Sequence, residues 1–178
     1  VNAGTIEFLL ESNEQFYFME MNTRIQVEHP VTECVTGIDL IKEQIRIAAG
    51  KKLSYRQQDV RIGGHAIECR INAENPKEQF RPSPGLITDV YFPGGKGVRI
   101  DTAVYNGYEV PAYYDSMLAK LIVHAKTRKE AISKMRSALG EVIIEGVDTN
   151  VDYQYEIMNH PDYQAGNVDI EFISEKMC

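Results

Sequence analysis

Five side chains that could do chemistry recur at every second position of one short segment. They are Glu20, Asn22, Arg24, Gln26 and Glu28. In extended backbone, alternate side chains point to the same face, although a turn near Thr23 is compatible with the sequence. A half-buried strand with one wet face shows the same alternation. Solvated strand faces usually carry Lys, Thr and Ser, however, whereas this face mixes carboxylates, an amide and a guanidinium.

A further carboxylate, Glu7, lies in the preceding strand-like segment, where antiparallel pairing could place it across from Glu20. Two carboxylates from neighbouring strands, with Asn22 beside one of them, form a hard oxygen site. Mg2+ prefers such oxygen ligands and commonly shares its shell with substrate phosphates. Without a cation, the two like charges would oppose each other's ionisation. The residues therefore predict a magnesium site.

Two strands and a helix are expected around these residues. The strands are Thr5–Leu10 and Gln15–Asn22, joined by a polar turn over residues 11–14. After Pro30 the apolar spacing becomes helical, and Gly50 is a natural helix end. The helical positions are Ile38, Ile41, Ile45 and Ala48. A polar connector over residues 51–63 follows, and a domain boundary is predicted near its end.

The remaining residues are predicted to form several adjacent strands followed by helices, which indicates an α+β domain. The expected strands are His65–Ala73, Leu86–Phe92, Val98–Thr102 and Ser116–His124, with a Pro- and Gly-rich loop over Pro76–Gly85. A helix begins with Thr127, whose hydroxyl can cap it while Glu130 reaches back. The apolar face of that helix carries Ile132, Met135 and Leu139. Thr149 with Asp152 suggests another helix start, and His160-Pro161 its end.

Composition narrows the class of protein. The 178 residues are 43% hydrophobic, which is enough for a core, and no segment is of low complexity. A formal net charge of −7 disfavours nucleic acid as a partner, because an acidic surface repels phosphates. No apolar run is long enough to span a membrane. The three cysteines, Cys34, Cys69 and Cys178, lack metal-ligand spacing, so reduced thiols in a cytoplasmic protein are expected.

The run from Glu20 to Glu33 resembles the signature of the biotin carboxylase family, and Gly4–Phe8 is similar to the strand before it. The likeness continues in Gly37–Ile41, Gly64–Glu74, Pro82–Gly85, Pro93–Gly95, Tyr114–Met117 and Thr149–Val151. It therefore covers nearly the whole chain, in order. The resemblance implies an α+β fold: residues 1–62 as the C-terminal portion of an ATP-grasp domain, then residues 63–178 as the biotin carboxylase C-terminal domain, an antiparallel sheet with helices.

The chain opens with Val1-Asn2-Ala3-Gly4, without an initiator Met, and soon enters a strand. It is therefore expected to be a piece of a longer protein. The resemblance implies that the first domain, the glycine-rich lid and other ATP-binding residues lie upstream. The isolated chain is then expected to be inactive.

The reaction that the resemblance implies joins ATP and bicarbonate into carboxyphosphate, which releases CO2 to N1′ of biotin. Matching positions make Glu7 and Glu20 ligands of Mg2+ or Mn2+ that bridge ATP phosphates, with Asn22 assisting a second ion. Leu9 and Ile170 match positions near the adenine. Ordinary core packing explains these two apolar residues nearly as well.

The resemblance also assigns the anion site. Arg24 matches the catalytic arginine that binds bicarbonate, and Gln26 with the backbone N–H of Val27 would complete the cradle. Glu28 matches the general base that takes the bicarbonate proton. Arg70 matches the residue that stabilises the biotin enolate. Taken singly, an arginine such as Arg24 or Arg70 is more often a surface or ion-paired residue, and Glu28 beside His29 is more often a solvated pair than a base.

The implied partners are a biotin carboxyl carrier protein, carboxyltransferase subunits and a second copy of the chain. Arg99 fits a homodimer of this family, whereas Lys96 stands where an aromatic residue often occurs. The favoured parent is the biotin carboxylase subunit of acetyl-CoA carboxylase, which serves fatty acid synthesis, since the chain ends shortly after Ile170 without a linker. One alternative is that the parent is a pyruvate, propionyl-CoA or methylcrotonyl-CoA carboxylase. A second is a carbamoyl-phosphate-forming ligase, which Arg70 argues against. A third is that the chain is a non-catalytic folding or dimerisation module.

Overall fold

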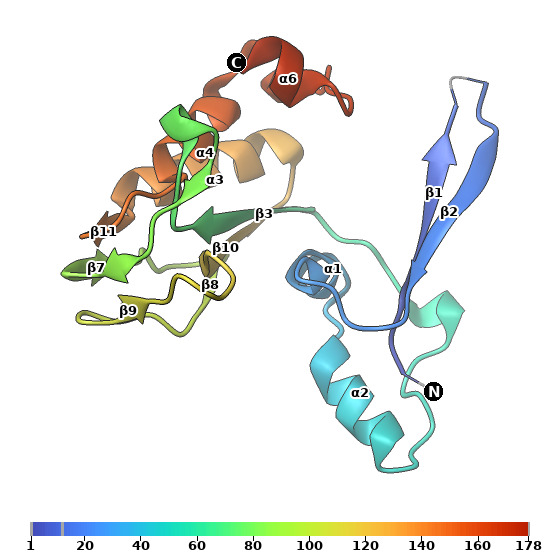
Figure 1. Ribbon diagram of the computed structural model, residues 1–178. Helices are drawn as coiled ribbons and strands as arrows, with labels where there is room; N and C mark the ends of the chain where they lie inside the picture. Colours follow the sequence, from blue (N-terminus) through green and yellow to red (C-terminus); the bar gives the residue numbers. More distant parts are fainter. Residues whose placement is uncertain (1, 12, 178) are drawn as a thin grey trace. The chain divides into compact units, whose positions relative to one another are not determined.

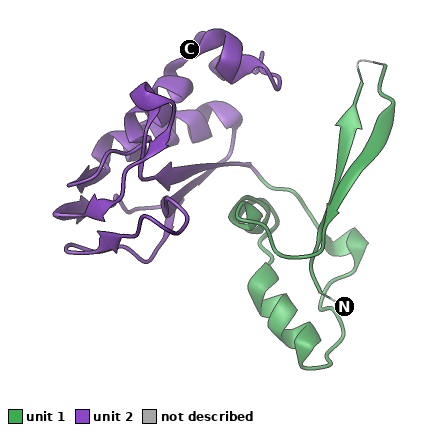
Figure 2. Ribbon diagram, in the orientation of Figure 1, with its two compact units in different colours: residues 1–63 green, residues 64–178 purple. Residues whose placement is uncertain are grey.

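The computed structural model describes residues 2–11 and 13–177. The chain divides into two compact units, Val1–Gly63 and Gly64–Cys178, coloured separately in Figure 2. Both units combine helices with antiparallel strands, which confirms the α+β class. Ser12 of the expected turn and Cys178 lie outside the described residues. None of the helices in the described residues has the length and hydropathy needed to cross a bilayer.

The first unit begins with a two-stranded antiparallel ribbon of β1 (Thr5–Leu10) and β2 (Phe16–Asn22), as Figure 1 shows. Both predicted strands are thus confirmed. The register pairs Glu7 with Glu20 and then shifts, so that β2 carries one extra residue, Met19. Such a bulge increases local twist and re-aims side chains.

The helical pattern after Pro30 produces two helices where one was predicted. α1 (His29–Thr36) ends at Gly37, whose φ of +71° suits a residue without a side chain. α2 (Leu40–Ala48) begins after Asp39, whose carboxylate accepts the Lys42 N–H at 2.7 Å. The Glu33 carboxylate accepts the Leu40 N–H at 2.8 Å, which ties the end of α1 to the start of α2.

A buried carboxylate fixes the polar connector, which includes the short helix η1 (Gln57–Asp59), to α2. Glu43 is 7% exposed and accepts the Ser54 N–H at 3.0 Å and the Ser54 hydroxyl at 2.8 Å. Arg46 Nε lies 3.3 Å from the same side chain. These contacts, the Ser54 backbone N–H first among them, hold the pKa of Glu43 below its usual value.

The second unit is built on a three-stranded sheet in the order β3-β10-β8, formed by β3 (His65–Asn72), β10 (Met117–Ala125) and β8 (Val98–Thr102). Alternate residues of one sheet face pack against α3 (Arg128–Glu141) and α4 (Val151–Asn159). The buried side chains of this core are Ile67, Cys69, Ile71, Ala119, Leu121, Val123, Ala131, Ile132, Met135, Ala138, Leu139, Val151 and Met158. Burial raises the pKa of Cys69 to about 12, so this thiol stays protonated.

Short paired strands flank the sheet. They are β4 (Glu74–Asn75) with β5 (Arg81–Pro82), β6 (Gly85–Leu86) with β9 (Glu109–Val110), and β7 (Asp89–Tyr91) with β11 (Ile143–Glu145). The strand predicted over Leu86–Phe92 was wrong, because the chain breaks there into β6 and β7. Between them, buried Ile87 donates its N–H to the Tyr108 carbonyl at 2.9 Å. The 3-10 helix η2 (Pro76–Glu78) and the helices α5 (Pro161–Ala165) and α6 (Phe172–Lys176) complete the unit.

Two helix starts differ in detail from the prediction. The Thr127 hydroxyl accepts the Glu130 N–H at 3.2 Å, as predicted, but the Glu130 carboxylate accepts from the Lys126 N–H at 3.1 Å. α4 begins after Asn150, one residue later than Thr149. The predicted end of α4 at His160-Pro161 is confirmed.

The ribbon exposes apolar side chains on both strands, which leads to a first prediction. The half-exposed or more exposed residues include Ile6, Leu9, Leu10, Phe16, Phe18 and Met21. Few buried contacts therefore oppose local opening of β1 and β2. In amide hydrogen exchange of this chain, we expect the ribbon to exchange at least about tenfold faster than β3 and β10. Equal protection of both units would contradict this expectation.

Candidate functional site

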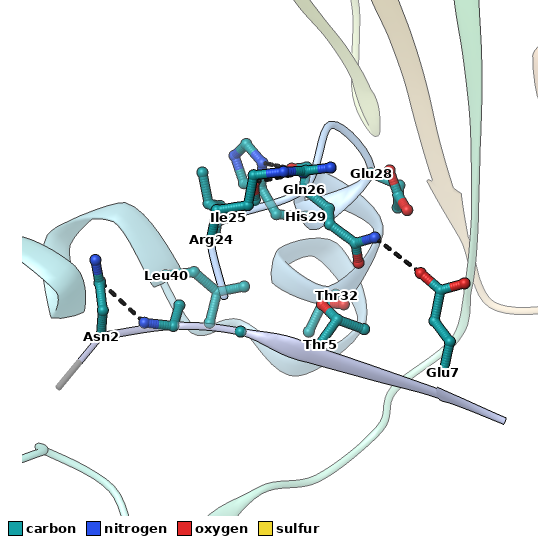
Figure 3. A pocket seen from close by; sticks show the side chains of 12 residues that line it. Asn2, Thr5, Glu7, Arg24, Ile25, Gln26, Glu28, His29, Thr32 and Leu40 are labelled. Atoms are coloured by element: carbon teal, nitrogen blue, oxygen red, sulfur yellow. Dashed lines mark hydrogen bonds between the residues drawn. The ribbon is translucent and has the colours of Figure 1, made fainter. Parts of the chain in front are cut away.

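Glu7 and Glu20 face each other across the ribbon and share one amide group. Asn22 Nδ2 donates to Glu7 Oε1 at 2.8 Å and to Glu20 Oε1 at 3.0 Å. Gln26 Nε2 donates to the same Glu7 oxygen at 3.1 Å, a bond drawn in Figure 3. The two amides thus offset part of the repulsion between the carboxylates.

The donor set fits a hard divalent cation. The Oε2 atoms of Glu7 and Glu20 take part in none of these amide bonds, so each carboxylate can offer an oxygen to Mg2+. Asn22 turns its NH2 group toward the carboxylates and would join the shell only through Oδ1. Among the described residues there is no group of three or more His, Cys, Asp and Glu side chains able to hold a metal. An ion here would therefore take most of its ligands from water or substrate.

A pocket of about 660 Å³ opens beside this pair. Four of the predicted site residues line it: Glu7, Arg24, Gln26 and Glu28. Its other walls come from residues 2–5 before and within β1 and from α1 (Figure 3). Glu20, Asn22 and Val27 are not among the residues that line the pocket. The structure thus brings Arg24 and Gln26, two of the three residues predicted for bicarbonate, into one pocket with Glu28 and Glu7, and Asn22 links Glu7 to Glu20.

The loop after β2 positions the anion-site residues. The strand ends at Asn22, so the extended form stops before Arg24, as the sequence allowed. The His29 ring Nδ1 lies 2.7 Å from the Gln26 carbonyl oxygen and steadies the turn. Glu28 occupies the N-cap position of α1, where the helix dipole favours a negative charge. Arg24 is exposed, and its Nη1 donates to the Ile25 carbonyl at 3.2 Å.

Arg70 belongs to the second unit and lies on the β3 face that points away from the helical core. The strand register places it in one row with Lys120 and Asp101. Lys120 Nζ lies 3.4 Å from Asp101 Oδ2, and Arg99 donates to both Asp101 oxygens at 2.8 Å. Because the negative charge of Asp101 offsets that of Lys120, the two cations Lys120 and Arg70 can lie side by side in this row.

Asn150 is a residue that sequence reasoning noted only as part of a family motif. It is 5% exposed, its Oδ1 accepts the Asn72 N–H at 2.9 Å, and its Nδ2 donates to the Arg70 carbonyl at 3.1 Å. These bonds fix the β3 backbone on both sides of Ile71. The sequence does show a polar residue at a predicted helix start. It does not show which distant residues the Asn150 side chain contacts.

Three further residues singled out from the sequence are not among those that line this pocket. Leu9 in the first unit is 57% exposed, and Ile170 in the second is 99% exposed, so neither packs in a core of its own unit. Lys96 is exposed, and its carbonyl accepts from Lys134 Nζ at 3.0 Å.

Two family profiles match the chain. The profile described as "Carbamoyl-phosphate synthase L chain, ATP binding domain" matches residues 1–56, and "Biotin carboxylase C-terminal domain" matches residues 68–175. The first profile, with the oxygen site on the ribbon, defines the class of ATP-grasp proteins. The second covers more than half of the chain. The chain belongs to the biotin carboxylase family.

Known relatives agree over both units. The chain is 59% identical over 175 residues to the biotin carboxylase of Allochromatium vinosum, which covers 98% of this chain and 38% of that protein. It is 56% identical over 174 residues to a pyruvate carboxylase subunit of Methanothermobacter thermautotrophicus, and this match covers 98% of this chain and 35% of that protein. The biotin carboxylase domain dimer of Hydrogenobacter thermophilus 2-oxoglutarate carboxylase, in complex with MgADP, ADP and bicarbonate, superposes with a TM-score of 0.96 at 50% identity, covering 98% of this chain and 38% of that one.

The chain therefore spans well under half the length of these relatives. Because biotin carboxylases match across both segments, the alternative of a carbamoyl-phosphate-forming ligase is not favoured.

The carboxylate pair yields a second prediction. Replacing Asn22 by Asp removes the shared amide donor and adds a third negative charge, so the ribbon should lose about 1 kcal/mol of stability without metal. Because three carboxylates attract a divalent cation, millimolar Mg2+ should recover most of that loss. Thermal unfolding of Asn22→Asp and of the unchanged chain, each with and without Mg2+, measures both effects. A metal-independent difference would refute the proposed cation site.

The charge row yields a third prediction, on pH. The bidentate bond from Arg99, with help from Lys120, lowers the pKa of Asp101 in the folded state. The resulting stabilisation is present above the unfolded value near 4 and is lost as the pH falls through the lower folded value. We expect Asp101→Asn to cost about 1 kcal/mol at pH 7 and progressively less below pH 4. Urea unfolding of the unchanged chain and of Asp101→Asn, at pH 7 and again below pH 4, measures this difference. Asp89→Asn is the control.

Proposed function

We propose that this chain is part of an ATP-dependent biotin carboxylase, a ligase that uses ATP and bicarbonate to carboxylate biotin on a carrier protein. The observation that carries the proposal is the convergence of Arg24, Gln26 and Glu28 on a pocket whose wall includes the metal-site carboxylate Glu7. Phosphoryl transfer to bicarbonate needs an anion site next to a cation site, and this arrangement is compatible with both.

Bicarbonate would bind to Arg24 and Gln26. A planar guanidinium offers two parallel N–H donors to a planar oxyanion, which an ammonium group cannot do. The Val27 N–H is the third proposed donor. Because the present Arg24 bond is to a backbone carbonyl only, its remaining N–H groups can turn to an anion without breaking an ion pair.

Glu28 would take the proton of bicarbonate and so raise the nucleophilicity of the oxygen that attacks phosphorus. A general base must lie within reach of the proton that it takes, and Glu28 lines the same pocket as the proposed bicarbonate ligands Arg24 and Gln26. The proton then resides on the Glu28 carboxyl group until it passes to solvent, and the phosphate released when carboxyphosphate breaks down would take the proton of biotin.

Glu7 and Glu20 would hold Mg2+ or Mn2+, with Asn22 beside them. When bound, the ion neutralises phosphate charge during transfer. The contribution of the chain is to orient the two carboxylates through the Asn22 and Gln26 amides. Leu9 and Ile170 are proposed contacts of the adenine, and their exposure leaves them accessible to a nucleotide.

Arg70 would stabilise the enolate form of biotin, because an adjacent positive charge favours the anion of a weakly acidic ureido group. Two features support this role. Asn150 fixes the backbone at Arg70, and Asp101 engages Lys120, the cation next to Arg70 in the strand register, as well as Arg99 on its own strand.

The parent enzyme is proposed to be the biotin carboxylase subunit of a cytoplasmic acetyl-CoA carboxylase, working with a biotin carboxyl carrier protein and carboxyltransferase subunits. Relatives named for biotin carboxylase and for pyruvate carboxylase are similar to nearly the same degree. Assembly as a homodimer is supported by the dimeric domain of the Hydrogenobacter relative. The acceptor can be identified by incubating the carboxylated carrier and the carboxyltransferase subunits with acetyl-CoA or with pyruvate. The measurement is which of the two becomes carboxylated.

The fourth prediction concerns the anion site in the full-length parent. Arg24→Ala and Glu28→Gln should each reduce biotin-dependent, bicarbonate-dependent ATP hydrolysis by at least about 100-fold in kcat, because one removes charge stabilisation and the other the base. Lys51→Ala, in the exposed connector, is the matched control and should stay within about twofold. The isolated chain should hydrolyse no ATP. Near-normal turnover of either site variant would exclude the proposed roles.

A further inference from the structure

A second pocket lies in the other unit, between α3 and the end of α5. One stripe of α3 forms one wall, with Lys129, Ile132, Ser133 and Arg136 at helical spacings of three and four. Gln164 and Ala165 form the other wall, and the volume is about 460 Å³. That volume lies within the range of small-molecule sites.

The two cations of this pocket lack partners among the described residues. Arg136 Nε is buried and has no hydrogen-bond acceptor in the described part of the chain. Neither Arg136 nor Lys129 forms an ion pair or side-chain hydrogen bond with another described residue. A buried N–H of a charged group without an acceptor is costly, so an acceptor supplied from outside would stabilise the site.

The neighbouring Arg128 shows the contrast. It donates to the carbonyls of Tyr163 and Gln164, the latter at 2.8 Å, and its guanidinium carbon lies 4.9 Å from the centre of the Tyr163 ring. Arg128 is therefore satisfied by the protein and joins α3 to α5.

We propose that the α3–α5 pocket binds a small polyvalent anion through its phosphate or carboxylate groups. Arg136 would supply paired N–H donors, Lys129 a point charge, and Ser133 a hydroxyl donor, over an apolar floor at Ile132. Lys129 lies in the first turn of the 14-residue helix α3, where the helix dipole also favours an anion. In a chain of net charge −7, two such cations on one pocket wall are a local exception.

This site shares no residue with the proposed reaction centre. Within the second unit, α3 packs on the sheet face formed by Ile67, Cys69 and Ile71, and Arg70 points to the other face. The inference therefore does not depend on the function proposed for Arg24 or Arg70.

Titration calorimetry of the 178-residue chain at fixed ionic strength tests the proposal, with sodium pyrophosphate and sodium citrate as probes and no divalent metal. We expect saturable binding of at least one probe at one site. If only pyrophosphate binds, the pocket recognises phosphate groups. If both probes bind, it also accepts carboxylate groups. Arg136→Gln should weaken the affinity at least about tenfold, and Lys129→Gln at least about threefold.

Three variants make the result decisive. Lys77→Gln, on η2 and outside the pocket, should leave the affinity unchanged, and so should Arg24→Gln, which alters the other anion site. Arg136→Lys keeps the charge and should bind more strongly than Arg136→Gln, while thermal unfolding shows that each variant is folded. Absence of saturable binding, or a loss that follows Arg24 and not Arg136, would overturn the proposal.

Discussion

The repulsion between Glu7 and Glu20 is the constraint on which the first unit depends. Antiparallel register places these carboxylates opposite each other, and the Asn22 amide bonds to both. Gln26 can reach Glu7 only because the chain leaves the extended form after Asn22 and turns back toward β1. The same turn carries Arg24 and Glu28 to the pocket. The proposed cation site and the proposed anion site are thus two ends of one arrangement that begins with a like-charge pair.

The second unit handles charge differently. Its sheet buries one face completely against α3 and α4, so the opposite face can carry the row of Arg70, Lys120 and Asp101 on a rigid support. Here opposite charges meet, the reverse of the ribbon: Asp101 contacts Lys120 in the row and makes a bidentate contact with Arg99, which lowers the pKa of Asp101. Asn150 adds hydrogen bonds from a distant helix start, which makes the backbone at Arg70 part of the core structure.

Period-two alternation was sufficient to predict β1, β2 and the approach of Glu20 to Glu7, because neighbouring strands with a short turn leave few alternative pairings. It failed where a single backbone position decides the outcome. Gly37 at positive φ divides the helical stretch, and the Ile87 N–H bonds to Tyr108 between two short strands. Asn150 could not be found from local pattern, since its partner Asn72 is 78 residues away in the sequence.

The arginines show how the fold separates structural charges from chemical ones. Arg46, Arg81 and Arg99 each pair with a carboxylate, and Arg128 with carbonyls, so their charges hold the structure together. The N–H groups of an exposed arginine without a protein partner donate hydrogen bonds to water. Arg24 and Arg136 differ from the paired arginines, because each lines a pocket while no described carboxylate pairs with it. In an acidic chain with carboxylates to spare, a guanidinium left unneutralised at a pocket wall is a position where an anion from solution can do what the protein's own carboxylates do elsewhere.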